Sequence, residues 1–107
     1  MAINIEGHIW LKGPHGLHFG KGRYQLLEQI LLHESISEAA RQLGMSYRKA
    51  WAMVKEMNQT SNKPLVDKQA GGLNGGRATV TAEGKKWIHR YQIMYREFEE
   101  FKKMKRL

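Results

Sequence analysis

The residues best suited to chemistry in this chain are basic side chains that follow Ser46 at helical spacing. Ser46 can cap a helix whose first turn contains Arg48 and Lys49, and Lys55 lies on the same side further along. An arginine guanidinium can donate two hydrogen bonds to guanine O6 and N7, and a helix N-terminus adds positive partial charge. The pattern predicts a helix face that reads base edges in a major groove. An ordinary solvated basic face is the alternative.

Two aromatic side chains flank this basic face, one helical turn apart. We expect Tyr47 to be open enough for its hydroxyl to reach a phosphate. Trp51 is expected to pack against the first helix or the following hairpin. The face carries no acid before Glu56, and the small side chain of Ala52 would let the helix approach a groove closely. These two features favour nucleic-acid binding over a face that is merely soluble.

A glycine-rich hairpin, or wing, is predicted after this helix, with strands at 65–68 and 78–81. Lys68 and Arg77 flank its tip, where four glycines would let backbone N–H groups approach a phosphate or a minor-groove edge. A simple flexible tip is the alternative. The tip residues that we assign to DNA contact are Gly75 and Gly76.

No catalytic or metal-binding constellation emerges from the sequence. His15 and His18 have a metal-like spacing, but they lie in a glycine-rich loop with no third ligand nearby. The GGLNGG run lies within a hairpin, so it is no dinucleotide fingerprint, and GKGR lacks the spacing of a phosphate-binding loop. The chain contains no cysteine. We therefore expect a protein that is not an enzyme and holds neither a cofactor nor a metal.

Composition and charge agree with a partner that is an anionic polymer. The 107 residues are 41% hydrophobic and 26% charged, as in a folded domain rather than a disordered chain. The net charge of +8 favours nucleic acid as the partner. No apolar run approaches the roughly 18 residues that cross a bilayer, and the N-terminus lacks the pattern of a signal peptide. The expectation is a cytoplasmic protein without a membrane partner.

A helix-turn-helix over 35–59 would position the basic face. Ala39 and Ala40 supply the small contact between two helices, and Gly44 supplies the tight turn between them. Either Ser35 or Ser37 can cap the first of these helices. An ordinary helical hairpin with a glycine corner is the alternative. The inner face of the predicted helix-turn-helix would be sealed by Leu43, Met45, Ala50, Met53 or Val54, and Met57.

The remaining elements complete an α+β fold that is mainly helical. We predict an N-terminal strand over 3–12, a loop over 13–22 and a helix over 23–33. The whole chain is read as one winged helix-turn-helix domain, 1–107, in which the wing covers 64–81 and a long C-terminal dimerisation helix covers 82–106. The apolar face of the first helix is expected to contain Tyr24, Leu26, Leu27, Ile30, Leu31 and Leu32.

Aromatic and apolar residues recur every three or four positions along the last helix, as in a heptad seam. A domain this small can cover only part of such a stripe, so we expect it to form the interface of a two-fold homodimer. Two recognition helices would then enter successive major grooves roughly 34 Å apart. The alternative is a monomer in which the helix packs on its own core. The predicted seam consists of Trp87, Tyr91, Met94, Phe98 and Phe101.

SISEAARQLGMSYRKAW from residue 35 and PLVDKQAGGLNGGRATVTAEG from residue 64 resemble the ModE family of molybdate-responsive regulators. GHIWLKG and GPHGLHFGKGR near the start are also similar to that family's DNA-binding domain, and LysR-type regulators share the more general pattern. The resemblance implies a dimeric winged-helix transcription factor with Ser46, Arg48, Lys49 and the wing glycines at the DNA. ModE proteins usually continue into oxyanion-binding domains, whereas this sequence stops at Leu107. We therefore expect any ligand sensing to come from a separate partner protein or from an unexpected pocket.

The leading hypothesis is a transcription regulator that binds double-stranded DNA as a dimer on a palindromic operator. A protein-interaction module on a winged-helix scaffold is one alternative, in which the basic face serves only solubility. A sensor that binds a small oxyanion in its glycine-rich loops is the other.

Overall fold

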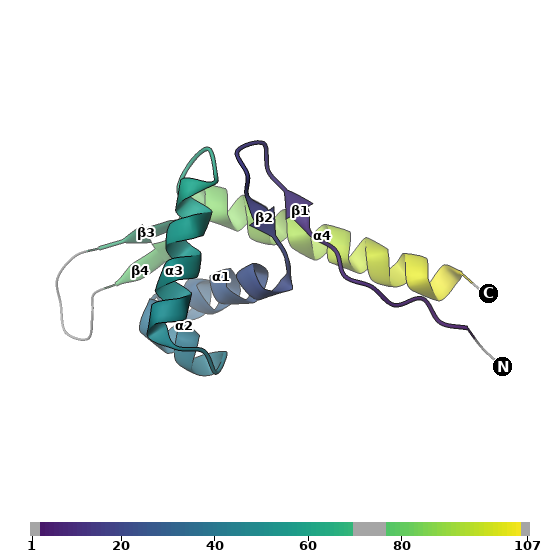
Figure 1. Cartoon of the computed structure of the whole chain (residues 1–107), viewed down its shortest axis with the longest axis horizontal. Coiled ribbons are helices and arrows are strands. Elements are labelled where there is room, and N and C mark those ends of the chain that lie inside the picture. Colours follow the sequence, from purple (N-terminus) through teal and green to yellow (C-terminus); the bar gives the residue numbers. More distant parts are fainter. Residues whose placement is uncertain (1–2, 70–76, 106–107) are drawn as a thin grey trace.

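The computed structural model describes residues 3–69 and 77–105 (Figure 1). Helices and short antiparallel strand pairs make up the α+β, mainly helical winged helix-turn-helix that the sequence predicts. In chain order the elements are β1 (Leu11–Lys12), β2 (His18–Phe19), α1 (Lys21–His33), α2 (Ile36–Gln42), α3 (Tyr47–Gln59), β3 (Val66–Lys68), β4 (Ala78–Val80) and α4 (Ala82–Met104).

Side-chain oxygens fix where three of the helices begin. Ser35, Ser46 and Thr81 precede α2, α3 and α4, and each accepts a hydrogen bond of 3.0 Å from the backbone N–H three residues on. Such caps satisfy donors that have no partner within the helix. Of the two serines that could cap the second helix, the structure therefore selects Ser35. Between α2 and α3, Gly44 has φ +65, the left-handed conformation that the predicted turn requires.

The prediction of a strand over 3–12 is wrong in extent. Only Leu11–Lys12 is paired, and its antiparallel partner, His18–Phe19, lies inside the segment predicted as a loop. Residues 3–10 run as an extended segment beside the second half of α4 (Figure 1), where a Cβ added to Gly7 would lie 3.4 Å from Phe98 Cζ. Among the described residues no second strand lies beside this segment, and of its apolar side chains Ile5 and Ile9 are half-buried whereas Ile3 and Trp10 are exposed.

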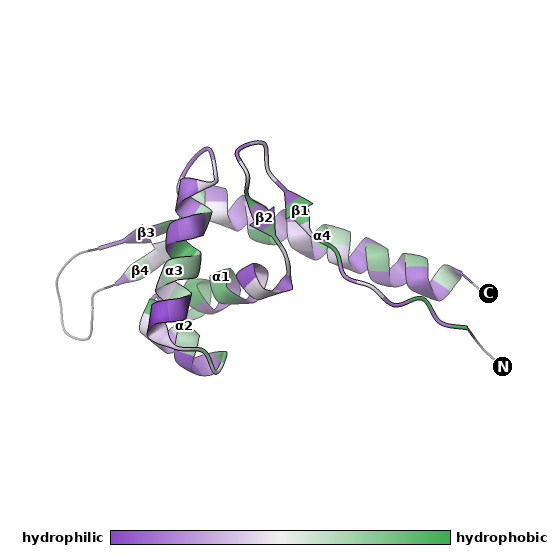
Figure 2. Ribbon diagram, in the orientation of Figure 1, coloured by the Kyte–Doolittle hydropathy of each residue, from purple (hydrophilic) through white to green (hydrophobic). Residues whose placement is uncertain are grey.

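The core forms where α1 packs against α2, the strands β2 and β4 and the first half of α4, and the buried side of α3 packs against α2. From α1 it takes Leu26, Leu27 and Ile30, while Leu32, predicted on the same face, is 71% exposed. Hydrophilic and hydrophobic segments alternate along α3, as expected of an amphipathic helix (Figure 2). Within the described part of the chain, no helix is both long enough and apolar enough to span a lipid bilayer.

A carboxylate network on α2 leads to a pH prediction. Glu38 accepts hydrogen bonds from Arg41 Nε (2.9 Å) and Nη2 (2.6 Å) and from Gln42 Nε2 (2.9 Å). The Arg41 hydrogen bonds, followed by that of Gln42, lower the pKa of Glu38 from 4.5 to about 2. Because the folded pKa lies below the ordinary value, this carboxylate favours the folded state above pH 4.5 and loses that contribution as the pH falls toward 2.

Arg41→Ala is therefore expected to raise the pKa of Glu38 toward its ordinary value. An NMR titration of the Glu38 side-chain carboxyl would measure it. Arg48→Ala, which removes an exposed arginine from α3, is the control and should leave the titration unchanged. A Glu38 titration that is the same with and without Arg41 would contradict this assignment.

Candidate nucleic-acid interface

The two sides of α3 differ as the sequence predicts. Ala50, Val54 and Met57 are fully buried against the core. The opposite side is exposed and carries Arg48, Lys49, Ala52, Lys55 and Gln59. Glu56, the first acid on this helix, accepts a 2.5 Å hydrogen bond from Arg23 Nη2 of α1. The positive charge at the start of α3 therefore has no acidic neighbour on its own helix.

The helix-turn-helix that presents this face packs through the expected small residues. Ala39 and Ala40 are buried where α2 meets α3, and Leu43, Met45 and Met53 lie partly buried against the same core. The Met45 N–H donates to the Ala40 carbonyl at 3.0 Å, which closes the turn around Gly44. A Cβ at Gly44 would meet no atom within 4 Å, so glycine is needed there for its backbone conformation and not for space.

A lysine of the wing lies against the aromatic pair of α3. Lys68 Nζ is 4.4 Å from the centre of the Trp51 ring and 3.3 Å from the Tyr47 hydroxyl oxygen. Trp51 therefore contacts the wing, one of the two packings expected for it, while Tyr47 stays 41% exposed. Both of these neighbours are neutral, so they hold Lys68 beside α3 without cancelling its charge.

Asn58 joins α3 to the wing, and sequence reasoning did not identify it. Its Oδ1 accepts hydrogen bonds from the N–H groups of Leu65 (2.8 Å) and Val66 (3.1 Å), and its Nδ2 donates to the Val66 carbonyl at 2.9 Å. Because a two-stranded hairpin has little stability of its own, such contacts set where the wing lies. An asparagine near a helix end has many other uses, so its position alone carries no signal.

The second wing cation is paired within the chain. Arg77 Nε donates to Glu34 Oε2 at 2.5 Å, and its Nη2 contacts the same oxygen. Glu34 follows the last turn of α1, and no sequence pattern predicts its contact with the wing, 43 residues away. Gly75 and Gly76, the tip glycines assigned to DNA contact, lie outside the described residues.

The predicted seam on α4 divides into two parts. Tyr91 is 3% exposed and packs within its own chain, with its ring 4.6 Å from that of Tyr24 and 5.9 Å from that of Phe19. Trp87 is half-buried, 5.6 Å from Phe19. Further along the helix, Phe98 is half-buried, and the exposed apolar side chains are Ile93, Met94, Tyr95, Phe101 and Met104.

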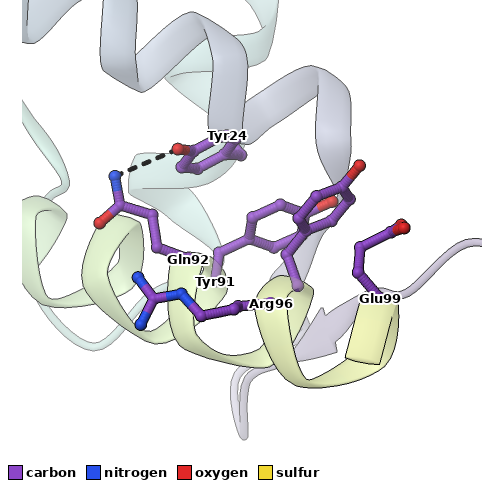
Figure 3. Close-up of a pocket in the computed structure, with 6 residues that line it drawn as sticks. Tyr24, Tyr91, Gln92, Arg96 and Glu99 are labelled. Carbon is purple, nitrogen blue, oxygen red and sulfur yellow. Dashed lines mark hydrogen bonds between the residues drawn. The ribbon is translucent and has the colours of Figure 1, made fainter. Parts of the chain in front are cut away.

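A groove of about 470 Å³ lies between α1 and α4 (Figure 3), and none of its lining residues belongs to α3. The Tyr24 hydroxyl donates to Glu28 Oε2 at 2.7 Å and accepts from Gln92 Nε2 at 3.2 Å. Burial, together with the Glu28 hydrogen bond, raises the pKa of Tyr24, and burial raises the pKa of Tyr91. The groove is lined by Tyr24, Tyr91, Gln92, Tyr95, Arg96 and Glu99.

Within 3–69 and 77–105, no three His, Asp or Glu side chains are grouped to hold a metal ion.

Comparison with known proteins gives consistent relatives. Residues 22–85 match the family described as bacterial regulatory helix-turn-helix protein, lysR family. The chain is 42% identical over 92 residues to the DNA-binding transcriptional dual regulator ModE of Escherichia coli K12, covering 86% of this chain and 35% of that protein. It is 31% identical over 96 residues to the transcriptional regulator ModE of Haemophilus influenzae, covering 90% and 38%.

A third relative is the molybdenum-pterin-binding protein MopA of Rhodobacter capsulatus, 40% identical over 75 residues, or 70% of this chain and 28% of that protein. The chain thus spans about a third of the length of the curated relatives that it matches. The resemblance to the ModE family expected from the sequence is confirmed by these matches. Since the family model covers more than half of its length, the chain belongs to the lysR family of bacterial regulatory helix-turn-helix proteins.

Proposed function

We propose that this protein is a DNA-binding transcriptional regulator that reads duplex DNA with the first turns of α3. The observation that carries the proposal is the exposed side of α3, where Arg48, Lys49 and Lys55 face solvent and the first turn carries no acid. Glu56, the acid on this helix, is paired with Arg23 of α1. Ser46 caps this helix, so the positive end of its dipole lies beside Arg48 and Lys49. As a regulator of this type, the protein would act in the cytoplasm, where the chromosome lies.

The wing would contact the DNA backbone beside α3. The Lys68 ammonium group donates a hydrogen bond to the Tyr47 hydroxyl on α3, so both groups can approach the same phosphate. Gly75 and Gly76 would supply backbone N–H donors at the wing tip. These contacts fix register on the duplex, whereas base preference comes from α3.

We further infer a two-fold homodimer through the second half of α4, on a palindromic operator. Met94 and Phe101 are 44% and 47% exposed, and the half-buried Phe98 lies between them on the same side of the helix. This part of α4 extends beyond the packed helices (Figure 1), and the N-terminal segment that lies against Phe98 leaves Met94 and Phe101 exposed. Of the predicted seam, Trp87 and Tyr91 then contribute mainly to the protomer core.

A salt series on duplex binding tests the proposal. Fluorescence anisotropy with a random-sequence duplex should give an association constant whose logarithm falls linearly with the logarithm of salt concentration, by about 0.9 for each phosphate contact. Absence of binding at about 50 mM salt, or binding that does not respond to salt, would contradict a DNA-binding role.

Base reading and backbone contact make different predictions for two variants. Arg48→Ala should lose about 1–3 kcal/mol of discrimination between the preferred and altered duplexes, because a bidentate contact to a base is removed. Lys68→Ala should weaken binding to all sequences about equally and reduce the salt slope by about 0.9, because a phosphate contact is removed. Anisotropy titrations with both duplexes measure the two effects. An equal loss on every sequence for Arg48→Ala would remove its assigned role.

A further inference from the structure

Glu34 occupies an unusual position between the helix-turn-helix and the wing. It ends α1 with φ 53 and ψ 36, and it is the one residue other than glycine with positive φ in the described part of the chain. Its backbone carbonyl accepts a hydrogen bond of 3.1 Å from the Ala78 N–H, at the start of β4. Glycine adopts this conformation more easily and would offer the same carbonyl, so the backbone does not explain a glutamate here.

The carboxylate of Glu34 has one evident use, which is its contact with Arg77. Both Nε and Nη2 of Arg77 approach Glu34 Oε2, and the side chains of the pair stay 44% (Glu34) and 62% (Arg77) exposed. An exposed ion pair contributes little to stability because water and salt screen it. The main effect to expect from the pair is therefore on the charge that Arg77 presents to a ligand.

The two wing cations, Lys68 and Arg77, differ in whether an acidic side chain is paired with them. Lys68 and the residue after Arg77 are opposite one another in the β3–β4 register, so both cations lie at the same end of the hairpin. Lys68 lies against the neutral rings of Tyr47 and Trp51, whereas Arg77 is paired with the carboxylate of Glu34. A phosphate that approaches this end of the wing meets the charge of Lys68 and an arginine that is already paired.

We propose that Glu34 competes with DNA phosphates for Arg77 and so limits the affinity of the wing for DNA of any sequence. The inference rests on the proposed function, since it concerns how that same interface is tuned. Holding one wing cation away from the backbone lowers sequence-independent binding, so the base contacts of α3 account for a larger share of the total affinity. Glu34 is then a specificity-determining residue that need not touch a base.

Glu34→Gln tests this proposal, because it removes the charge and keeps the shape of the side chain. Anisotropy titrations should show binding to a random duplex about three- to tenfold tighter at about 50 mM salt, with a salt slope steeper by about 0.9. The ratio of the affinity for a duplex of the preferred sequence to the affinity for the random duplex should fall. In an Arg77→Ala background, Glu34→Gln should not steepen the slope, because no arginine is released. The melting temperature of each variant would verify that the fold is unchanged.

Glu100→Gln is the matched control, since it removes the same charge from an exposed site on the second half of α4. Equal affinities for wild type and Glu34→Gln would overturn the inference. The same gain in the Arg77→Ala background, or in Glu100→Gln, would also overturn it by indicating a general charge effect. A wild-type protein that bound no duplex would instead overturn the proposed function, and this inference with it.

Discussion

Replacing Gly84 with alanine is expected to lower the free energy of unfolding by about 3 kcal/mol, because the added methyl group has no space. A Cβ at this position would overlap the Leu65 carbonyl oxygen and lie 2.6 Å from Val80 Cγ1. The backbone there cannot easily move. Thr81 donates from Oγ1 to the Pro64 carbonyl (2.6 Å) and from its N–H to the Leu65 carbonyl (3.0 Å), which fixes the start of α4 against the residues just before β3.

Denaturant unfolding followed by circular dichroism would measure this change. Gly22→Ala is the matched control, because Gly22 is also helical and a Cβ there would meet nothing within 4 Å. Its stability should be unchanged or higher by up to about 1 kcal/mol, as alanine favours helix. Equal stabilities for Gly84→Ala and wild type would contradict the close packing of the start of α4 against Leu65 and Val80.

Replacing Phe101 with aspartate is expected to separate the proposed dimer without unfolding the protomer. Phe101 is 47% exposed, so the substitution leaves the core intact but puts a charge in the middle of an apolar interface. The protein should sediment as a monomer. Its affinity for a two-fold operator should fall by about 100-fold or more, because the second half-site no longer benefits from linkage to the first.

Ile93→Asp is the control for this experiment. Ile93 lies on the same helix and is 37% exposed, but it points to a different side from Met94, Phe98 and Phe101. This variant should stay dimeric and keep its affinity for the operator. Sedimentation equilibrium and operator titrations read out both variants, and a Phe101→Asp protein that remained dimeric would exclude this face as the interface.

Local patterns predicted much of the fold and of α3. Spacing over a few residues is enough to identify the serine cap, the glycine turn and the apolar side of this helix. That side consists of Ala50, Val54 and Met57. The exposed basic side of α3 follows directly from that spacing. The wing strands were also predicted, because glycine-rich turns between β-forming segments have few other structures.

Features that depend on distant contacts were missed or misjudged. Glu34 and Arg77 meet because α1 and β4 pack together, and no local pattern reports such a pairing. The spacing of Trp87 and Tyr91 indicated an apolar face without indicating what covers it, and Phe19 of their own chain covers both. The alternating pattern before β1 likewise could not distinguish contact with a helix from pairing with a strand.

Selection of bound sequences from a random duplex pool tests most directly the central claim that α3 reads DNA bases. We predict that the recovered DNA is enriched in an inverted repeat whose half-sites lie about one helical turn, roughly 34 Å, apart. Recovered DNA no different in sequence from the starting pool would contradict base reading by α3, even if the protein binds duplex DNA.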